Sequence, residues 1–133
     1  MPKLTKKSQS KSSVINKVVF VLYLVGVFYL TLSPVDEIRP SFLETYLFTG
    51  VDKVVHAGLF TTFSILFYLA FDKDEWINLG LVAAVGILIE ILQHLLPTGR
   101  SFEWNDWWFD ILGGVVGIIL IKIYQTLRAK NRI

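Results

Sequence analysis

Apolar residues gather in four long stretches along this chain, and charged residues are concentrated between and beyond them. Each stretch is close to the length of about 20 residues that a helix needs to cross the hydrocarbon core of a bilayer. We therefore predict an all-α membrane protein with four transmembrane helices in a compact antiparallel bundle. The predicted spans are approximately residues 15–34, 53–71, 76–96 and 106–123.

Helix-breaking residues and a short connection mark the limits of these spans. No charged residue occurs between Val18 and Val35, and Pro34 ends the first stretch. The third stretch stops at Pro97-Thr98-Gly99, a strong termination signal. Only four residues, Asp72 to Glu75, connect the second and third stretches. Because so short a connection joins antiparallel neighbours, these two stretches should form a helical hairpin.

Lysine and arginine positions predict the orientation in the membrane. We expect residues 1–13, rich in Lys and Ser, to be a disordered cytoplasmic arm, residues 14–124 to be the four-helix domain, and residues 125–133 to be a basic cytoplasmic tail. Cytoplasmic segments then hold most of the basic residues, as the positive-inside rule requires. The inner set is Lys3, Lys6, Lys7, Lys11, Lys17, Lys73, Lys122, Arg128, Lys130 and Arg132, and the outer set is Arg39, Lys53 and Arg100. We expect a multi-pass protein of the cytoplasmic (plasma) membrane with N- and C-termini in the cytoplasm.

The first outer connection has a helical pattern of its own. Ser41 and Glu44 have the spacing of a capping box, and apolar residues recur at helical intervals between residues 42 and 47. This pattern predicts a short amphipathic helix at the outer membrane surface. The alternative is a partly apolar loop.

Composition narrows the classes of function. With 53% hydrophobic residues and a mean hydropathy of +0.55, the 133-residue chain is too apolar for an ordinary soluble domain. It contains no Cys, which excludes disulfides, thiol catalysis and cysteine-based metal sites. Because the net charge is only +2 and the basic residues flank apolar spans, we expect no nucleic-acid partner.

Polar residues within or beside the spans lie at the outer end of the predicted bundle. Residues three or four positions apart share one helix face, so each helix presents its polar group on one side. Three such faces can converge into an outward-opening pocket, with Arg100 available to pair with an acid or hold an anionic group. The three groups are Asp52 with His56, Glu90 with Gln93 and His94, and Asp106 with Asp110.

Several of these residues have a simpler explanation. Asp52 and Asp106 lie where an acid caps a helix and complements its dipole. His94 fits the headgroup layer, and His56 could form a hydrogen bond to a neighbouring helix. Glu90 is the strongest candidate for a functional site, because a carboxylate more than a turn inside an apolar helix needs a partner, a proton or water.

Small residues in the fourth span predict close helix packing. Gly113 and Gly117 form a Gly-x-x-x-Gly motif, and Gly114 lies beside it. Such a motif lets two helix backbones approach closely, either between two chains or within one bundle. We favour packing within the bundle, although an oligomer is compatible with the sequence.

These polar and glycine residues together resemble the pattern of the VanZ-like family of membrane proteins. The resemblance covers about residues 18–123, and the family usually has Asn where this chain has Asp110. It implies a small polytopic membrane protein; the founding member is associated with low-level teicoplanin resistance. The matching elements are Asp52-Lys53-x-x-His56, Glu90-x-x-Gln93 followed by Pro97 and Arg100, and Asp106-x-x-x-Asp110-x-x-Gly113-x-x-x-Gly117.

Our first functional hypothesis is an envelope protein whose outer pocket engages a membrane lipid, a cell-wall precursor or a lipoglycopeptide, and which contributes to teicoplanin tolerance. The sequence requires no cofactor for this role and leaves a divalent metal open. The expected pocket residues are Asp52, His56, Glu90, Gln93, Arg100, Asp106 and Asp110.

Two alternatives belong to other classes. A membrane-embedded metal-dependent hydrolase or transferase acting on a lipid-linked substrate would use nitrogen and oxygen ligands for a divalent ion, although the chain has no His-Glu-x-x-His motif. A small proton-coupled transporter would use the buried acids as a relay. Whether the protein is an enzyme therefore stays open. The candidate metal ligands are His56, Glu90, His94 and Asp110.

Overall fold

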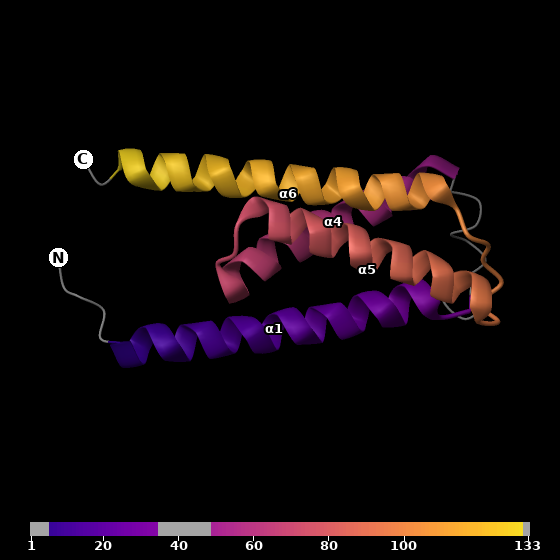
Figure 1. Cartoon of the computed structure of the whole chain (residues 1–133), viewed down its shortest axis with the longest axis horizontal. Helices are drawn as coiled ribbons and strands as arrows, with labels where there is room; N and C mark the ends of the chain where they lie inside the picture. The colour runs from indigo at the N-terminus through magenta and orange to yellow at the C-terminus, as the bar shows by residue number, and fades with distance from the viewer. Residues whose placement is uncertain (1–5, 35–48, 132–133) are drawn as a thin grey trace.

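The computed structural model describes residues 6–34 and 49–131, and every regular element in these ranges is a helix. Each helix is long and apolar enough to cross a membrane, which confirms the prediction of an all-α bundle of four transmembrane helices. The elements are α1 (Lys6–Leu32), α4 (Thr49–Phe71), α5 (Glu75–Leu95) and α6 (Trp104–Lys130) (Figure 1).

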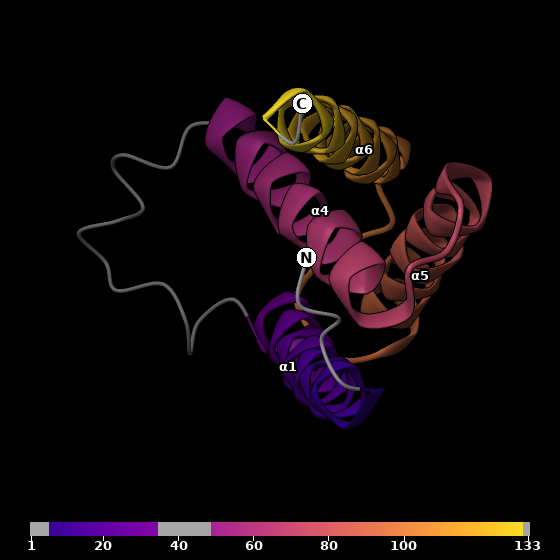
Figure 2. The ribbon, with the colours of Figure 1, turned by 90° about the vertical axis from the view of Figure 1, so that its left-hand side faces the viewer.

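The helices run up and down, so the start of α1 and the end of α6 lie at the same end of the bundle (Figure 1). Viewed along the bundle, α4 lies between α1 on one side and α5 and α6 on the other (Figure 2). Its most extensive contact is with α6. The ends of α1 and α5 and the starts of α4 and α6 therefore meet at the end of the bundle opposite the termini.

Local signals explain both ends of α5. Asp74 is the N-cap, and its side chain accepts a hydrogen bond of 2.9 Å from the backbone N–H of Ile77. At the other end the backbone becomes extended at Leu96, immediately before Pro97. Gly99 then adopts a φ of +71°, a conformation that glycine tolerates best. The predicted termination at this point is where the helix stops.

The terminal helices are longer than predicted. Residues 6–13, assigned from the sequence to a disordered arm, belong to α1, and residues 125–130 of the predicted basic tail belong to α6. Neither segment contains Gly or Pro, so each continues the adjoining apolar helix without a break. Arg128 and Lys130 also lie in the last turn of α6, where cations complement the helix dipole. The amphipathic helix predicted within residues 42–47 falls outside the described residues.

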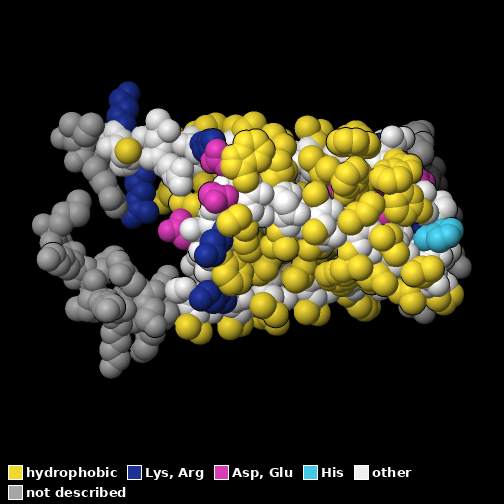
Figure 3. Space-filling view, viewed as in Figure 1, with side chains coloured by type: hydrophobic (Ala, Val, Ile, Leu, Met, Phe, Trp, Pro, Cys, Tyr) yellow, Lys and Arg dark blue, Asp and Glu magenta, His cyan; other side chains and the backbone are white. Residues whose placement is uncertain are grey.

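Aromatic side chains form the interior of the bundle. Phe20 of α1 meets Phe63 and Phe67 of α4 edge to face, with ring centroids 5.1 and 5.6 Å apart. Val82 and Ile89 of α5 complete this core and are fully buried. On the face seen in Figure 3, hydrophobic side chains cover the middle of the molecule, and most charged side chains lie towards the end that carries the termini. Such an apolar exterior suits contact with lipid tails.

Glycines bring α6 close to its neighbours. Gly113 lies so near the backbone carbonyl of Ala57 on α4 that a Cβ would overlap it. A Cβ at Gly117 would come within 2.7 Å of the Ser64 side chain, which is also on α4. Gly114 faces Val82 of α5, where a Cβ would lie 2.8 Å from the Val82 Cγ1 atom. All three glycines thus pack against other helices of the same chain.

Candidate functional site

Polar side chains from three helices meet inside the bundle at the end opposite the termini. His56 comes from the second turn of α4, Glu90 from the last part of α5, and Asp106 and Asp110 from the start of α6. Their exposed fractions are 2%, 0%, 6% and 0%, respectively. Burial of this many ionisable groups in an otherwise apolar bundle makes this cluster the candidate site.

The imidazole of His56 bridges two turns of α6. Its Nδ1 atom lies 2.8 Å from Oδ1 of Asp110, and its Nε2 atom lies 3.7 Å from Oδ2 of Asp106. Because Asp106 and Asp110 are one helical turn apart, both carboxylates face the same histidine. Spacing in the sequence predicted this shared face on α6, and the geometry adds His56 as the residue that joins it to α4.

A lysine lies at the edge of this cluster. The Nζ atom of Lys53 is 3.5 Å from Oδ1 of Asp106 and 3.7 Å from Oε2 of Glu103. The Lys53 side chain is 21% exposed and that of Glu103 is 51% exposed, so this edge is open to the surroundings. The ammonium offsets part of the negative charge that the acids of α6 bring to this end.

Glu90 anchors the connection that leads into α6. Its Oε2 atom accepts a hydrogen bond of 2.9 Å from the backbone N–H of Glu103, the N-cap residue of α6. The Glu103 side chain makes no capping hydrogen bond of its own, so a carboxylate from another helix satisfies this part of the helix start. The other carboxylate oxygen of Glu90, Oε1, is buried and has no hydrogen-bond partner.

Asp110 also has an unpartnered oxygen, and a glycine makes room for it. While Oδ1 of Asp110 is held by His56, Oδ2 is buried without a hydrogen-bond partner. A Cβ added at Gly86 of α5 would lie 2.8 Å from this Oδ2 atom and 3.1 Å from Cδ1 of Trp107. The Trp107 indole N–H in turn donates to the carbonyl of Ala83, at 3.0 Å, which fixes α6 against α5.

Two overlapping groups of potential metal ligands share His56. In the inner group, His56, Glu90 and Asp110 each offer one ligand atom, and these atoms lie within 4.8 Å of one another. In the outer group, His56 is combined in the same way with Asp52 and Asp106. The structure thus brings together five of the seven residues expected to line a pocket.

The remaining expected residues belong to neither ligand group. Gln93 is buried, but its Nε2 atom donates to the carbonyl of Thr31 on α1, at 2.8 Å. The side chain of His94 is exposed and belongs to neither ligand group. Arg100 is half-buried in the connection before α6, where its backbone N–H donates to Oγ1 of Thr98 at 3.2 Å. Its Nε atom is buried and has no hydrogen-bond partner among the described residues.

Sequence reasoning missed three contributors to this site. Glu103 supplies the backbone N–H that holds Glu90, Gly86 provides the space for Asp110, and Trp107 binds the backbone of α5. The role of Gly86 could have been predicted from the sequence, because a small residue one turn before Glu90 lies on the same helix face. The role of the Glu103 backbone could not have been predicted from the sequence, since it depends on the path of the connection after α5.

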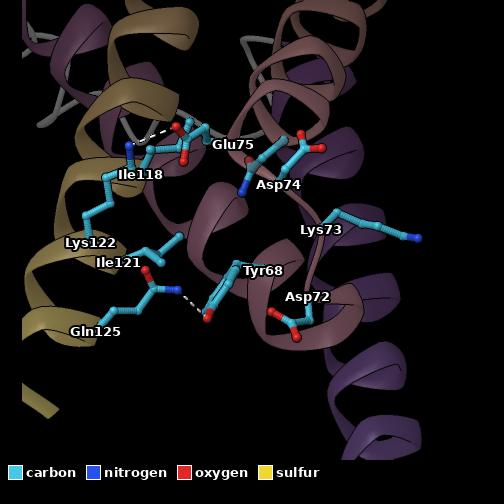
Figure 4. A pocket seen from close by; sticks show the side chains of 10 residues that line it. Tyr68, Asp72, Lys73, Asp74, Glu75, Ile118, Ile121, Lys122 and Gln125 are labelled. Atoms are coloured by element: carbon cyan, nitrogen blue, oxygen red, sulfur yellow. Dashed lines mark hydrogen bonds and ion pairs between the residues drawn. The ribbon is translucent and has the colours of Figure 1, made fainter. Parts of the chain in front are cut away.

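A separate cavity of about 240 Å³ lies at the opposite end of the bundle, near the α4–α5 turn (Figure 4). Lys122 of α6 donates to Glu75 of α5 across it at 2.8 Å, and Gln125 donates to the hydroxyl of Tyr68 at 2.6 Å. These contacts join α6 to the α4–α5 hairpin. The cavity is lined by Tyr68, Asp72, Lys73, Asp74, Glu75, Asn78, Ile118, Ile121, Lys122 and Gln125.

Comparison with known proteins identifies the family to which the chain belongs. Neither the curated proteins nor the solved structures include a match to the chain. The family model described as VanZ/LLP1 matches residues 6–125, which include α1, α4, α5, most of α6 and the whole polar cluster. The chain belongs to the VanZ/LLP1 family and is a VanZ-like membrane protein.

Proposed function

We propose that the protein resides in the cytoplasmic membrane with both termini in the cytoplasm and the polar cluster towards the cell exterior. The distribution of basic residues supports this orientation. Among the described residues, Lys53 and Arg100 are the basic residues at the end of the bundle that carries the cluster. The opposite end carries the remaining ones, as expected for the cytoplasmic side.

In this orientation the outer end engages the head group of a membrane lipid or a lipid-linked cell-wall precursor. The observation that carries the proposal is the convergence of buried His56, Glu90 and Asp110 from three helices, a costly arrangement for which packing alone gives no reason. The buried, unpartnered Nε atom of Arg100 adds a donor suited to a phosphate group.

Tryptophans beside the cluster fit an amphiphilic ligand. Trp104 and Trp108 are 60% and 58% exposed at the start of α6, the level of the bundle where the polar residues lie. Indole rings favour the boundary between acyl chains and head groups. They would therefore contact the apolar part of a ligand whose head group reaches the polar end.

Glycopeptide tolerance is the cellular role that this proposal favours. Teicoplanin is the relevant drug because of the founding family member, and a lipoglycopeptide combines an acyl chain with a polar part, as a lipid-linked precursor does. We propose that the protein reduces teicoplanin susceptibility through the ligand bound at its outer end.

A deletion strain complemented with variants tests this role. Deletion should increase susceptibility to teicoplanin more than to vancomycin, and the unaltered gene should restore tolerance. Arg100→Gln should restore less than the unaltered gene does. His94→Ala, which changes an exposed histidine outside the cluster, should restore it fully.

Mass spectrometry of the purified protein provides the second measurement. We expect a phosphate-containing lipid to co-purify with the protein and with His94→Ala, and to be depleted in Arg100→Gln. Unchanged susceptibility to both drugs after deletion, together with no co-purifying lipid, would refute the proposal.

A further inference from the structure

We infer that His56, Glu90 and Asp110 form a binding site for one divalent transition-metal ion, best suited to Zn²⁺, between α4, α5 and α6. The inference stands on the inner ligand group alone. It does not depend on which lipid or precursor the outer end engages.

Two unpartnered carboxylate oxygens are the first evidence for an ion. Glu90 and Asp110 are both fully buried, and each leaves one oxygen, Oε1 or Oδ2, without a hydrogen-bond partner. Such oxygens retain the desolvation cost of a buried charge without compensation. A cation between them would supply the missing interaction to both.

The orientation of these two oxygens is the second piece of evidence for an ion. Oδ2 of Asp110 points at α5 beside Gly86, and Glu90 lies one turn further along that same face of α5. Since Oε2 of Glu90 is occupied by the Glu103 backbone N–H, the free Oε1 is the oxygen left for an ion. Ligand atoms from all three residues lie within 4.8 Å of one another. Small side-chain rotations would bring them to the distances of about 2.0–2.2 Å that Zn²⁺ requires.

The two nitrogens of His56 face different carboxylates, as is typical of a histidine that binds a metal. Nδ1 faces Asp110 at 2.8 Å and is the nitrogen on the side of the inner group, where an ion would replace the proton of that hydrogen bond. Nε2 faces the Asp106 carboxylate at 3.7 Å. A histidine that binds a metal through one nitrogen usually donates its other N–H to a carboxylate, which fixes the ring. Asp106 is the carboxylate on the Nε2 side, and at 3.7 Å it would have to move closer to accept that N–H.

The outer group is the weaker candidate because a lysine already neutralises it. The Lys53 ammonium lies 3.5 Å from Oδ1 of Asp106 and would repel a divalent cation bound there. Glu90 and Asp110 have no lysine or arginine nitrogen within 4.0 Å among the described residues, as the ion pairs of this region show. Charge thus selects the inner group over the outer one.

The donor set identifies the class of ion. One imidazole and two carboxylates match Zn²⁺ or Mn²⁺, whereas Mg²⁺ and Ca²⁺ prefer oxygen ligands alone. Three protein ligands leave a fourth position on Zn²⁺ for water or a bound group. The site would then supply a Lewis acid inside the membrane protein, next to the outer end.

Metal titration of the full chain in detergent tests the site. After treatment with a chelator, we expect one Zn²⁺ to bind per chain by calorimetry and elemental analysis, and to raise the unfolding temperature. Mg²⁺ at the same concentration should not raise it. Glu90→Gln and Asp110→Asn should each weaken Zn²⁺ binding at least about tenfold.

Two control variants make the result specific. His94→Ala should bind Zn²⁺ as the unaltered chain does, and Asp52→Asn, which changes only the outer group, should do so as well. Tenfold weaker binding in Asp52→Asn with no change in Glu90→Gln would overturn the assignment to the inner group.

A spectroscopic measurement on the unaltered chain tests the site even if the variants fail to fold. Co²⁺ substituted for Zn²⁺ should give the visible absorption of a four-coordinate site with nitrogen and oxygen ligands, and added Zn²⁺ should abolish it. Absence of both Zn²⁺ stabilisation and the Co²⁺ spectrum, or equal stabilisation by Mg²⁺, would overturn the inference.

Discussion

Gly86 is the residue whose size decides how closely Asp110 approaches α5. A methyl group there would lie 2.8 Å from Oδ2 of Asp110, and the nearby indole of Trp107 leaves little room to move aside. Because Asp110 is also held by His56, displacement of its carboxylate would disturb the contact between α4 and α6. The lack of a side chain at position 86 thus permits the contact between α4, α5 and α6.

We predict that Gly86→Ala lowers the free energy of unfolding by about 1–3 kcal/mol, the usual cost of overpacking a well-packed site. Titration with SDS in mixed micelles, followed by circular dichroism, measures this. Gly80→Ala on the same helix is the control, since nothing lies within 4 Å of a Cβ there. An equal effect of the two substitutions would show that helix propensity, rather than contact with Asp110, sets the cost.

The residues of the site could be predicted only where helix periodicity determines their position. Spacing of four residues placed Asp106 and Asp110 on one face, and both do meet His56. The same reasoning grouped Gln93 with Glu90, yet Gln93 bonds to Thr31 on α1. Residues three apart differ by about 60° around a helix, which is enough to face different neighbours when three helices surround α5.

At the scale of the elements, the bundle depends on how closely α6 approaches α4. Gly113 lies against the carbonyl of Ala57. The single hydroxyl hydrogen of Thr61 is shared between the carbonyl oxygens of Gly113 and Ala57, which lie 3.0 and 2.8 Å from Oγ1, respectively. Without side chains at the contact, the two backbones come within reach of a single hydroxyl. This is the small-residue packing that membrane helices use in place of a hydrophobic driving force.

Gly113→Ala should therefore destabilise the protein more than any substitution at an open glycine. The added methyl group meets a backbone carbonyl, so α6 must shift as a unit, and we expect a loss of at least about 1–3 kcal/mol. Gly58→Ala on α4 has open space around its Cβ and should be neutral or stabilising by up to about 1 kcal/mol. The same SDS titration compares them, and equal stability of the two variants would contradict the packing argument.

Helix number and order followed from the apolar stretches, whereas helix length did not. Hydrophobicity determines where a chain can enter lipid, but a helix continues into water until a breaker or a better conformation stops it. α5 ended as predicted because Pro97 follows it, and α6 ran on to Lys130 because no Gly or Pro interrupts residues 118–130. Breakers therefore gave sharper limits than hydropathy did.

At the scale of the whole molecule, orientation determines what the polar cluster can reach. A cluster facing outward meets envelope lipids and precursors, and one facing inward meets the cytosol. The chain contains no Cys, so one introduced cysteine reports on one position only. Ser101 lies in the exposed connection beside the cluster, and Lys73 lies in the exposed turn at the opposite end.

We predict that a membrane-impermeant maleimide labels Ser101→Cys in intact spheroplasts and labels Lys73→Cys only after the membrane is opened. The reason is the charge bias of the two ends, since lysine and arginine resist translocation. The reverse pattern would place the cluster at the cytoplasmic side and remove the basis for contact with an external ligand. It would leave the inferred metal site intact, because the inner ligand group depends on helix packing rather than on the direction of insertion.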